Sequence, residues 1–386
     1  MTKKFNFSTI PAKSMEIDAL ACYALDSDDT GEFHVACSTK SMKLASFLAK
    51  ASDSDIALES SWQIAMKSRA WHVVASIPRE LADPTFFAAR EDGHFHAYGI
   101  DGRPCWSHDF SGTVSEFKCY EDPFTGDRVL IIPSIDKTLR MLTASAGQLV
   151  WGDTFQSGVN IVDQCLQADG ETHVIAAGGN DYTIRCYARK AVEAASAYKM
   201  AWFHKFDSYV RDVSISPRGK IAAVADDGFV KVFEIESGSI IWTHEHGSFA
   251  WKCRILEGDV ARVMSTSFQV PIDVDKSGEK LGNPGVVACH ELASGKLLWQ
   301  TAPEDGINVN AWDFHEVDGR WLLAAGTTGS EMVLLDIDTG NVLQRYSTGC
   351  LVNDVHFVEI NDGRLAIIGC QESEEESLFV GLQDSR

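Results

Sequence analysis

The stretch HELASGKLLWQT, residues 290–301, decides the fold. A Ser-Gly turn separates two runs that each suit a β-strand, and Trp299 lies in the second run. Similar stretches recur along the chain: GIDGRPCWSHDF (99–110), TASAGQLVWGDTF (143–155), FEIESGSIIWTHEH (233–246) and DIDTGNVLQRY (336–346). The stretch is therefore one copy of a repeating unit and not a local hairpin.

The spacing of tryptophan sets the length of this unit. One tryptophan falls in each of six successive repeats, at Trp62, Trp106, Trp151, Trp202, Trp242 and Trp299. In the fifth repeat, four short alternating runs read YVRDVSIS, GKIAAVADDG, FVKVFEIESG and SIIWTHEH. Short β-branched and aromatic runs bounded by Gly, Asp and Ser indicate four strands in a meander. We expect the tryptophans to pack one sheet against the next.

A single four-stranded sheet with two apolar faces cannot stand alone in water, whereas neighbouring sheets that stack face to face bury both faces. The sequence therefore predicts an all-β fold, a β-propeller of four-stranded blades that forms a single domain over residues 1–386. The first strands begin near Ile17, Ala70, Val114, Val159, Val210, Ala250, Val309 and Val352, which gives eight blades, or seven if the first repeat is irregular.

The two ends of the chain are expected to meet in one blade. The last repeat, residues 351–386, supplies only three strand-like runs, and residues 4–10 supply a fourth, which closes the ring. Two insertions interrupt the pattern. Residues 188–200 are Ala-rich and predict a short helix, whereas residues 267–285 predict a long polar loop, which could take part in binding.

Composition excludes some classes of partner. The chain has 34 Lys and Arg against 55 Asp and Glu, a formal net charge of −21, which argues against binding to nucleic acid or to an anionic membrane surface. No apolar run reaches the roughly 18 residues of a membrane span, and no secretory signal is visible, so we expect a cytoplasmic protein. The ten cysteines include no CxxC motif, which predicts reduced thiols and no zinc site.

The repeats resemble those of a known group. An acidic residue, three further residues, Gly and an apolar pair, as in EIESGSIIW and ELASGKLLW, are similar to the repeats of quinoprotein alcohol dehydrogenase-like propellers, which typically have eight blades. Residues 210–238 also resemble a WD40 unit. The resemblance implies a propeller, but the enzymes of the quinoprotein group bind their cofactor beside an adjacent cysteine pair and calcium. This chain has no adjacent cysteines, so we expect no cofactor and no catalysis.

Candidate binding residues come from aligning the eight first strands. The second position of each strand holds Asp18, Trp71, Ser115, Asn160, Arg211, Trp251, Asn310 and Asn353. In a propeller this position faces the rim of the central channel. Trp and Arg dominate binding hot spots, so we predict that Trp71, Asn160, Arg211, Trp251, Asn310 and Asn353 bind a protein partner. The alternative is that these side chains cap the edges of blades through hydrogen bonds to neighbouring backbone.

The next position holds His72, Glu116, Asp212, Lys252 and Asp354. We expect its carboxylates to accept backbone hydrogen bonds. The alternative function is an enzyme or small-ligand site in the central channel, similar to lyases or lactonases, with or without a metal. The pairs His94/His96 and His244/His246 lack an evident third metal ligand. The calcium-like DVDKSGE (273–279) and the acidic ESEEES (372–377) are interpreted as polar loops. No metal site is predicted.

Overall fold

The computed structural model describes residues 5–10, 17–24, 32–52, 56–76, 85–268, 285–302, 308–317, 319–360, 364–371 and 378–383. These residues form 32 strands in eight four-stranded antiparallel sheets. The chain divides into two compact units, of which the first is Met1–Asp109 with Val309–Arg386 and the second is Phe110–Asn308. Each unit contains four of the sheets.

Each sheet pairs four antiparallel strands in order, from the first to the fourth. In the first unit the sheets are β2 (Ile17–Ala24), β3 (Glu32–Thr39), β4 (Lys43–Ala51), β5 (Ile56–Ala65); β6 (Ala70–Ala75), β7 (Phe86–Arg90), β8 (His94–Tyr98), β9 (Pro104–Asp109); β26 (Val309–Val317), β27 (Arg320–Thr327), β28 (Glu331–Asp336), β29 (Val342–Ser347); and β30 (Val352–Glu359), β31 (Leu365–Gln371), β32 (Leu378–Gln383), β1 (Phe5–Ile10).

The second unit follows the same plan. Its sheets are β10 (Lys118–Glu121), β11 (Arg128–Pro133), β12 (Thr138–Thr143), β13 (Leu149–Thr154); β14 (Val159–Leu166), β15 (Thr172–Gly179), β16 (Thr183–Lys190), β17 (Lys199–Lys205); β18 (Val210–Ser216), β19 (Lys220–Ala225), β20 (Phe229–Glu234), β21 (Ile240–Glu245); and β22 (Phe249–Leu256), β23 (Arg262–Phe268), β24 (Val287–Glu291), β25 (Leu297–Thr301).

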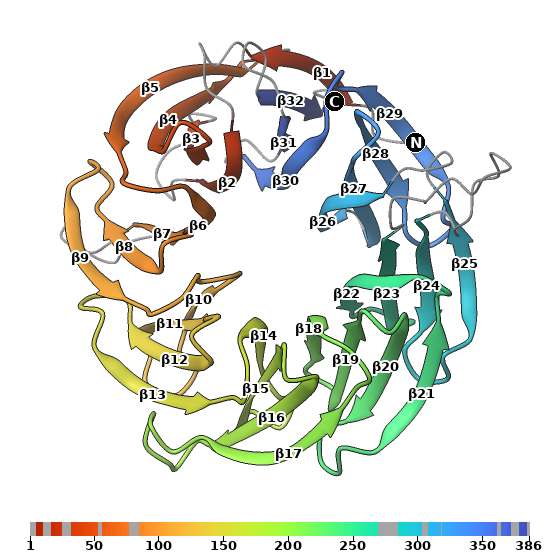
Figure 1. The fold of residues 1–386 in the computed structure, drawn as a ribbon. Helices are drawn as coiled ribbons and strands as arrows, with labels where there is room; N and C mark the ends of the chain where they lie inside the picture. Colours follow the sequence, from red (N-terminus) through yellow and green to blue (C-terminus); the bar gives the residue numbers. More distant parts are fainter. Residues whose placement is uncertain are drawn as a thin grey trace, which may run out of the picture. The chain divides into compact units, whose positions relative to one another are not determined.

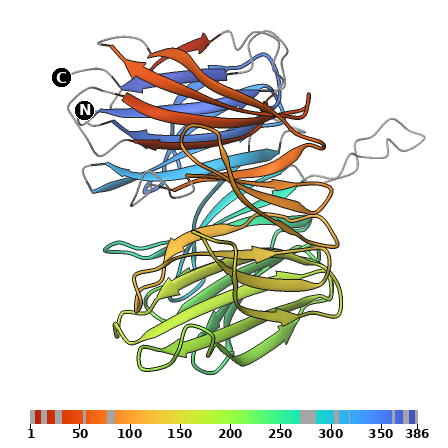
Figure 2. The ribbon, with the colours of Figure 1, turned by 90° about the vertical axis from the view of Figure 1, so that its left-hand side faces the viewer.

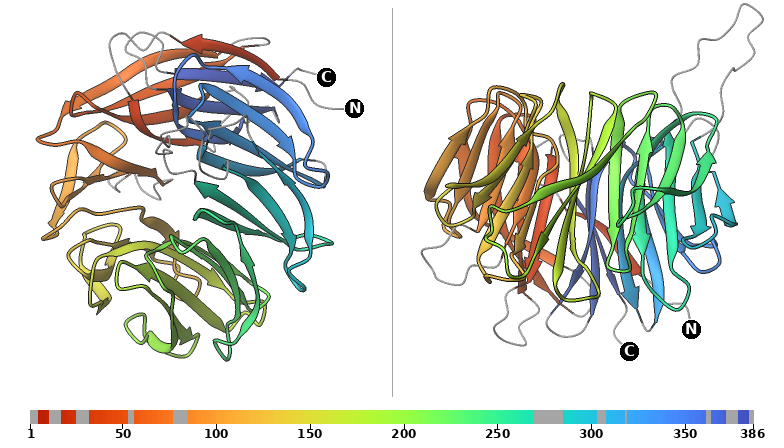
Figure 3. Two further views of the ribbon diagram at one scale, coloured as in Figure 1. Left: turned by 45° about the vertical axis from the view of Figure 1, so that its right-hand side comes forward. Right: turned by 90° about the horizontal axis from the view of Figure 1, so that it is seen from below.

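First strands of successive sheets contact one another, as β14 does with β18 and β18 with β22 in the second unit, and β26 with β30 in the first (Figure 1). The strands of a sheet run side by side, so their turns gather at two opposite ends (Figures 2 and 3). Meander sheets that pack face to face in this way are the blades of a β-propeller. The predicted fold class and the count of eight blades are therefore confirmed, whereas the prediction of a single domain stays a prediction.

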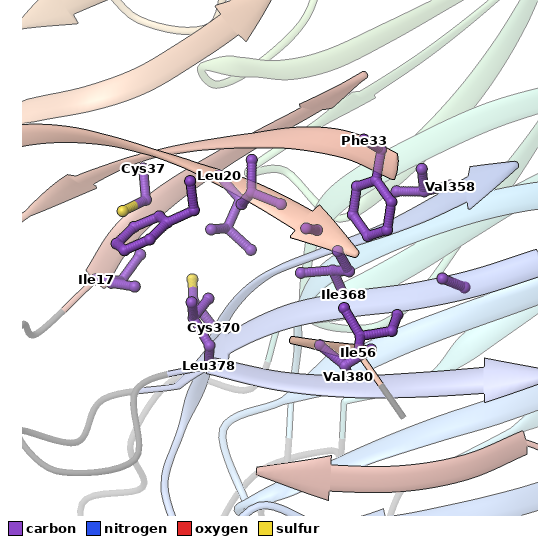
Figure 4. Close-up of a cluster of buried hydrophobic side chains, with 14 of the residues drawn as sticks. Ile17, Leu20, Phe33, Cys37, Ile56, Val358, Ile368, Cys370, Leu378 and Val380 are labelled. Carbon is purple, nitrogen blue, oxygen red and sulfur yellow. The ribbon is translucent and has the colours of Figure 1, made fainter. Parts of the chain in front are cut away.

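The burial pattern explains why these sequences form blades. Second strands are buried on both faces and read as continuous apolar runs, as in IIGC of β31 and IAAVA of β19. Fourth strands alternate between exposed and part-buried residues, as in β21, because only one of their faces meets a neighbouring blade. In the first unit, Ile17, Leu20 and Phe33 of the first blade pack against Ile368 and Leu378 of the last blade (Figure 4).

In four blades a tryptophan on the fourth strand contacts the following blade. The Trp242 Nε1–H donates a hydrogen bond of 2.8 Å to the carbonyl oxygen of Leu292, in the turn between the third and fourth strands of the following blade. The ring lies against Gly295, whose φ of +72° is left-handed and where a Cβ atom would come within 2.7 Å of the indole. Glycine is thus required twice, for its conformation and for the close approach. Equivalent contacts join Trp62 to Ile100 and Gly102, and Trp202 to Ile235 and Gly238.

The Ala-rich insertion keeps this interaction but is not a helix, so that prediction is wrong. Residues 191–198 form turns between β16 and β17. Eight residues leave little room for a helix, and Tyr198 is held in place by its buried ring. The carbonyl oxygen of Tyr198 accepts the Trp151 Nε1–H at 3.2 Å, and its ring packs against Trp151 at a centroid distance of 5.4 Å. The insertion therefore replaces the glycine turn as the partner of the tryptophan.

The amino-terminal strand completes the last blade, as predicted. β1 pairs antiparallel with β32, from Phe5 opposite Gln383 to Ile10 opposite Leu378. In the preceding blade Gln344 stands in place of tryptophan, and its amide accepts the Phe5 N–H at 3.2 Å and donates to the Phe5 carbonyl at 2.7 Å. The predicted loop at 267–285 and the acidic segment at 372–377 lie largely or wholly outside the described residues.

A pair of glycine variants tests the tryptophan contact. Gly295→Ala should lower the free energy of unfolding by roughly 2–4 kcal/mol, since it adds a clash with Trp242 to the cost of a left-handed alanine. Gly170→Ala is the matched control, because Gly170 also has a positive φ (+68°) but a Cβ atom there meets nothing within 4 Å. It should cost only about 1 kcal/mol. Urea unfolding measures both, and equal losses would contradict the docking of Trp242 on this turn.

Candidate functional site

The predicted binding column coincides with a β-bulge at the start of the first strands. In seven of the eight blades the pairing register shifts across the column residue, for example between Val210 and Asp212 and between Ala250 and Lys252. A bulged residue is left out of the ladder, so its side chain is aimed away from the sheet. The column therefore lies at the end of each blade where the chain enters from the preceding fourth strand.

The asparagines of the column hold the next blade. The Asn310 amide donates 2.9 Å to the Val352 carbonyl, and the Asn353 amide donates 2.9 Å to the Ile17 carbonyl. Asn160 donates 3.0 Å to the Val210 carbonyl. This is the edge-capping role that the sequence left open as the alternative. Partner binding by these three asparagines stays a prediction.

Two tryptophans of the column are placed differently. Trp71, in the first unit, is 58% exposed, and its Nε1–H donates 3.0 Å to a carboxylate oxygen of Glu91. Trp251, in the second unit, is partly buried between other side chains, with its ring centroid 5.3 Å from that of Phe268. The side chain of Asp18, the column residue of the first blade, lies outside what the structure describes.

Arg211 and Trp251 belong to a row of stacked side chains across three blades of the second unit, which we call the aromatic row: Tyr182, Tyr209, Arg211, Trp251 and Phe268. The rings of Tyr182 and Tyr209 lie 5.4 Å apart between centroids. The Arg211 guanidinium lies 5.3 Å from the Tyr209 ring and 5.5 Å from the Trp251 ring. Both distances are within the range of cation–π attraction.

The charge of Arg211 is balanced inside the blade. Its guanidinium donates two hydrogen bonds to the Asp226 carboxylate, one of them 2.7 Å from Nε to Oδ1. A bidentate pair of this kind fixes the orientation of the guanidinium plane. The aromatic row is thus held rigid and carries no net charge of its own. Tyr209 is 39% exposed. Phe249, which lies opposite Phe268 of the row in the pairing of β22 with β23, is 42% exposed.

The carboxylates of the next column fasten first strands together. Asp212 accepts the Cys253 N–H at 2.9 Å, and Asp354 accepts the Leu20 N–H at 3.1 Å. These contacts confirm that both carboxylates accept backbone hydrogen bonds. Two further residues that the sequence did not single out do the same: Asp163 accepts the Ile215 N–H at 2.9 Å and Asp313 the Phe357 N–H at 2.8 Å. They lie two residues further along their strands, on the same face.

Charges cluster on the first strands of each unit. In the second unit the Lys118 ammonium donates 2.7 Å to Glu116, while burial and the Glu116 carboxylate raise the pKa of Asp212, against the opposing charge of Lys252. In the first unit His356 lies 3.3 Å from Asp354 and 4.0 Å from Asp313. Burial alone would lower the pKa of His356, but the two carboxylates raise it to about 9.

The histidine pairs gain neighbours that the sequence could not reveal. His290 lies beside His244, with ring centroids 4.3 Å apart, and His246 is 5.0 Å from His244. Burial and the nearby imidazoles lower the pKa of His246 to about 3 and that of His290 to about 4. At the other pair, Arg90 lies 3.0 Å from His96. In the described ranges no cluster of three or more His, Cys, Asp or Glu side chains could hold a metal ion.

Known proteins resemble the chain mainly in fold. Residues 59–249 match a family of PQQ-like repeats described as outer membrane protein assembly factor BamB. No curated protein matches the sequence significantly. Among the described residues, no helix has the length and apolar character that crossing a membrane requires.

Three solved structures share the architecture. The crystal structure of Sqt1 from Saccharomyces cerevisiae has a TM-score of 0.72 at 8% identity and full coverage of both chains. The computationally designed Ika8 protein has a TM-score of 0.67 at 14% identity, covering 97% of this chain and 98% of that one. BamB from Moraxella catarrhalis has a TM-score of 0.60 at 12% identity, covering 98% and 99%. Identities this low indicate a common fold and carry no function.

The charge cluster around His356 generates a pH-dependent prediction. The folded pKa of about 9 exceeds the ordinary value of 6.5, so the folded state holds this proton more tightly. The stabilisation is complete below pH 6.5 and is lost as pH rises through 9. Asp354 and Asp313 are the carboxylates that act on His356, and His72 acts in turn on Asp354. The urea midpoint of the wild type should therefore fall more steeply between pH 6.5 and 9.5 than that of His356→Gln.

The control for this prediction is His94→Gln, which removes a histidine that is 45% exposed on another blade of the same unit. Its pH dependence should follow that of the wild type. Parallel pH dependences of the wild type and His356→Gln would show that the two carboxylates do not hold a proton on His356.

Proposed function

We propose that this chain, a PQQ-like β-propeller, is a non-catalytic module that binds a protein partner through the aromatic row of its second unit. The observation that carries the proposal is the row itself: tyrosine, arginine, tryptophan and phenylalanine side chains stacked across three blades and partly open to solvent. Tyr, Trp and Arg are the residue types most enriched in interface hot spots.

The packing of the blades does not require these side chains. The blades are already joined by tryptophans on their fourth strands and by carboxylates on their first strands. The large exposed rings of Tyr209 and Phe249 leave apolar surface in water. Such surface is typical of a site that another molecule covers.

The setting of the row also suits binding. Trp251 and Arg211 project from bulges in strands that are paired along their length, and Asp226 fixes the guanidinium. A partner would therefore meet side chains that are already ordered, and little conformational entropy would be lost when it docks. Trp71 occupies the same bulge position in the first unit and is a second candidate contact.

The alternative function is an enzyme or small-ligand site among the charged residues of the first strands. Glu116, Lys118, Asp212 and Lys252 bring acids and bases together in the second unit, and the raised pKa of Asp212 favours a proton-transfer role there. However, Asp212 already accepts a backbone hydrogen bond from the next blade. We therefore favour binding over catalysis. Elemental analysis of the purified protein would distinguish the two, because a stoichiometric metal would favour the alternative.

Variants of the aromatic row test the proposed function. Proteins carrying Trp251→Ala or Tyr209→Ala, and the wild type, are used as baits in lysate of the source cell, and recovered proteins are quantified by mass spectrometry. A partner that uses the row should be recovered at least about tenfold less with either variant, as expected when a hot-spot residue is truncated. Each candidate partner is then purified, and its dissociation constant is measured against all baits.

Phe203→Ala is the matched control, because Phe203 is 61% exposed on a fourth strand outside the row. It should recover the same proteins as the wild type. Thermal unfolding confirms that each bait is folded. If every reproducible partner binds Trp251→Ala, Tyr209→Ala and wild type equally well, the row is not the binding site.

A further inference from the structure

The aromatic row ends in a residue whose backbone conformation is unusual for its type. Tyr182, in the turn between β15 and β16, has a φ of 69°. The equivalent turns of the second and fifth blades have glycine there, Gly93 with a φ of 84° and Gly228 with a φ of 87°, whereas those of the first, third and seventh blades have Met42, Lys137 and Ser330 with φ values of 58°, 76° and 68°. The left-handed region disfavours a bulky side chain, so a tyrosine at this place is costly to the fold.

The Tyr182 ring is not needed to fill a core. It is only partly buried, and its aromatic contact is with Tyr209, which is itself 39% exposed. A strained residue that contributes an exposed ring to a surface is typical of a functional position. Tyr182 therefore adds to the row a partly exposed ring that the core does not require.

Unbalanced negative charge borders the same row. Asp207 lies two residues before Tyr209, and Asp227 lies in the turn between β19 and β20. The Asp227 carboxylate accepts the Asp207 N–H at 3.2 Å. Within the described part of the chain no ion pair joins either carboxylate to a cation, whereas Arg211 is already paired with Asp226. The whole chain carries a formal charge of −21. The row thus combines partly exposed aromatic side chains with carboxylates that form no ion pair with a cation in the described part of the chain.

We propose that the aromatic row binds an extended, arginine- or lysine-rich segment of a partner protein. The aliphatic stems and cationic groups of that segment would contact the solvent-exposed parts of Tyr209, Trp251 and Phe249, and its charges would meet Asp207 and Asp227. Cations are attracted to aromatic faces, most strongly to tryptophan. The acidic chain would also steer a basic partner toward the site before contact. This inference rests on the proposed function and adds the chemistry of the partner.

A defined peptide tests the inference without knowledge of the partner. A fluorescein-labelled peptide of alternating arginine and glycine is titrated with the purified full chain, and binding is followed by anisotropy at low and high salt. An otherwise identical peptide with glutamate in place of arginine is the comparison. We expect the arginine peptide to bind, its affinity to fall as salt rises, and the glutamate peptide not to bind.

Three variants locate the binding. Trp251→Ala should weaken the arginine peptide about tenfold or more. The double variant Asp207→Asn/Asp227→Asn should weaken it and flatten the salt dependence. Its control is Glu236→Gln/Asp259→Asn, which removes two exposed carboxylates from turns at the opposite end of the same blades. That control should leave binding unchanged, because general attraction to an acidic protein would respond equally to both pairs.

Tyr182→Gly separates recognition from stability. The substitution relieves the left-handed strain, so the unfolding midpoint should stay unchanged or rise, while binding of the arginine peptide should weaken severalfold. Ser330→Gly is the matched control: Ser330 has a φ of 68° in the equivalent turn of a blade in the first unit, so it should gain stability and bind normally.

Failure of the inference is distinct from failure of the proposed function. No binding of the arginine peptide, equal binding by Trp251→Ala, or preference for the glutamate peptide would overturn the basic-segment proposal. If natural partners are still lost from the Trp251→Ala bait, the row remains a protein-binding site of different chemistry. If neither the peptide nor natural partners depend on the row, both proposals are wrong.

Discussion

The structure depends on the contact between an indole ring and a left-handed glycine turn. Each blade alone has apolar faces that it cannot hide, and its outermost strand has only one neighbour in the sheet. Trp242 on Gly295, with its Nε1–H on the Leu292 carbonyl, brings the outer edge of one blade onto the turn of the next. Since the ring fits only where no Cβ atom intervenes, the contact also fixes the relative position of the two sheets.

The first strand of each blade forms the other edge of its sheet. Its free edge presents backbone N–H and C=O groups that would be costly to leave unpaired. Side chains from the preceding blade meet this need, because Asp212 accepts Cys253 N–H and Asn353 donates to the Ile17 carbonyl. The bulges that aim these side chains forward are the same bulges that place Arg211 and Trp251 at the surface. The same β-bulges therefore direct side chains that join neighbouring blades and side chains that lie at the surface.

The repeating architecture could be predicted from sequence because the glycine turn and the tryptophan carry the same geometry in every copy. The completion of the last blade by β1 followed from counting strands. The helix expected at residues 188–200 was wrong because alanine content indicates local propensity, whereas Tyr198 must reach Trp151 on another strand. The contact of Tyr198 with Trp151 therefore outweighed the helix propensity of the alanines.

The candidate site was only partly visible in the sequence. Aligning first strands found Arg211 and Trp251, but a one-dimensional column cannot show that Asn310 and Asn353 point to the neighbouring backbone. Tyr182 and Tyr209 were missed because they lie in turns rather than in the aligned strands. His290 was missed because it reaches His244 only across a blade interface. The signal that the sequence did offer is an aromatic residue, Tyr182, at the turn position where the second and fifth repeats have glycine.

The most direct test of forward docking between blades is residue-resolved amide hydrogen exchange on the first strands. The N–H groups of Ile215, Cys253 and Phe357 lie on strand edges, and each is held by a carboxylate of the preceding blade. These amides should exchange as slowly as the paired amides of second strands, and Asp212→Asn should accelerate exchange at Cys253 far more than at Phe357. Exchange of these amides at the rate of exposed turns in the native protein would contradict it.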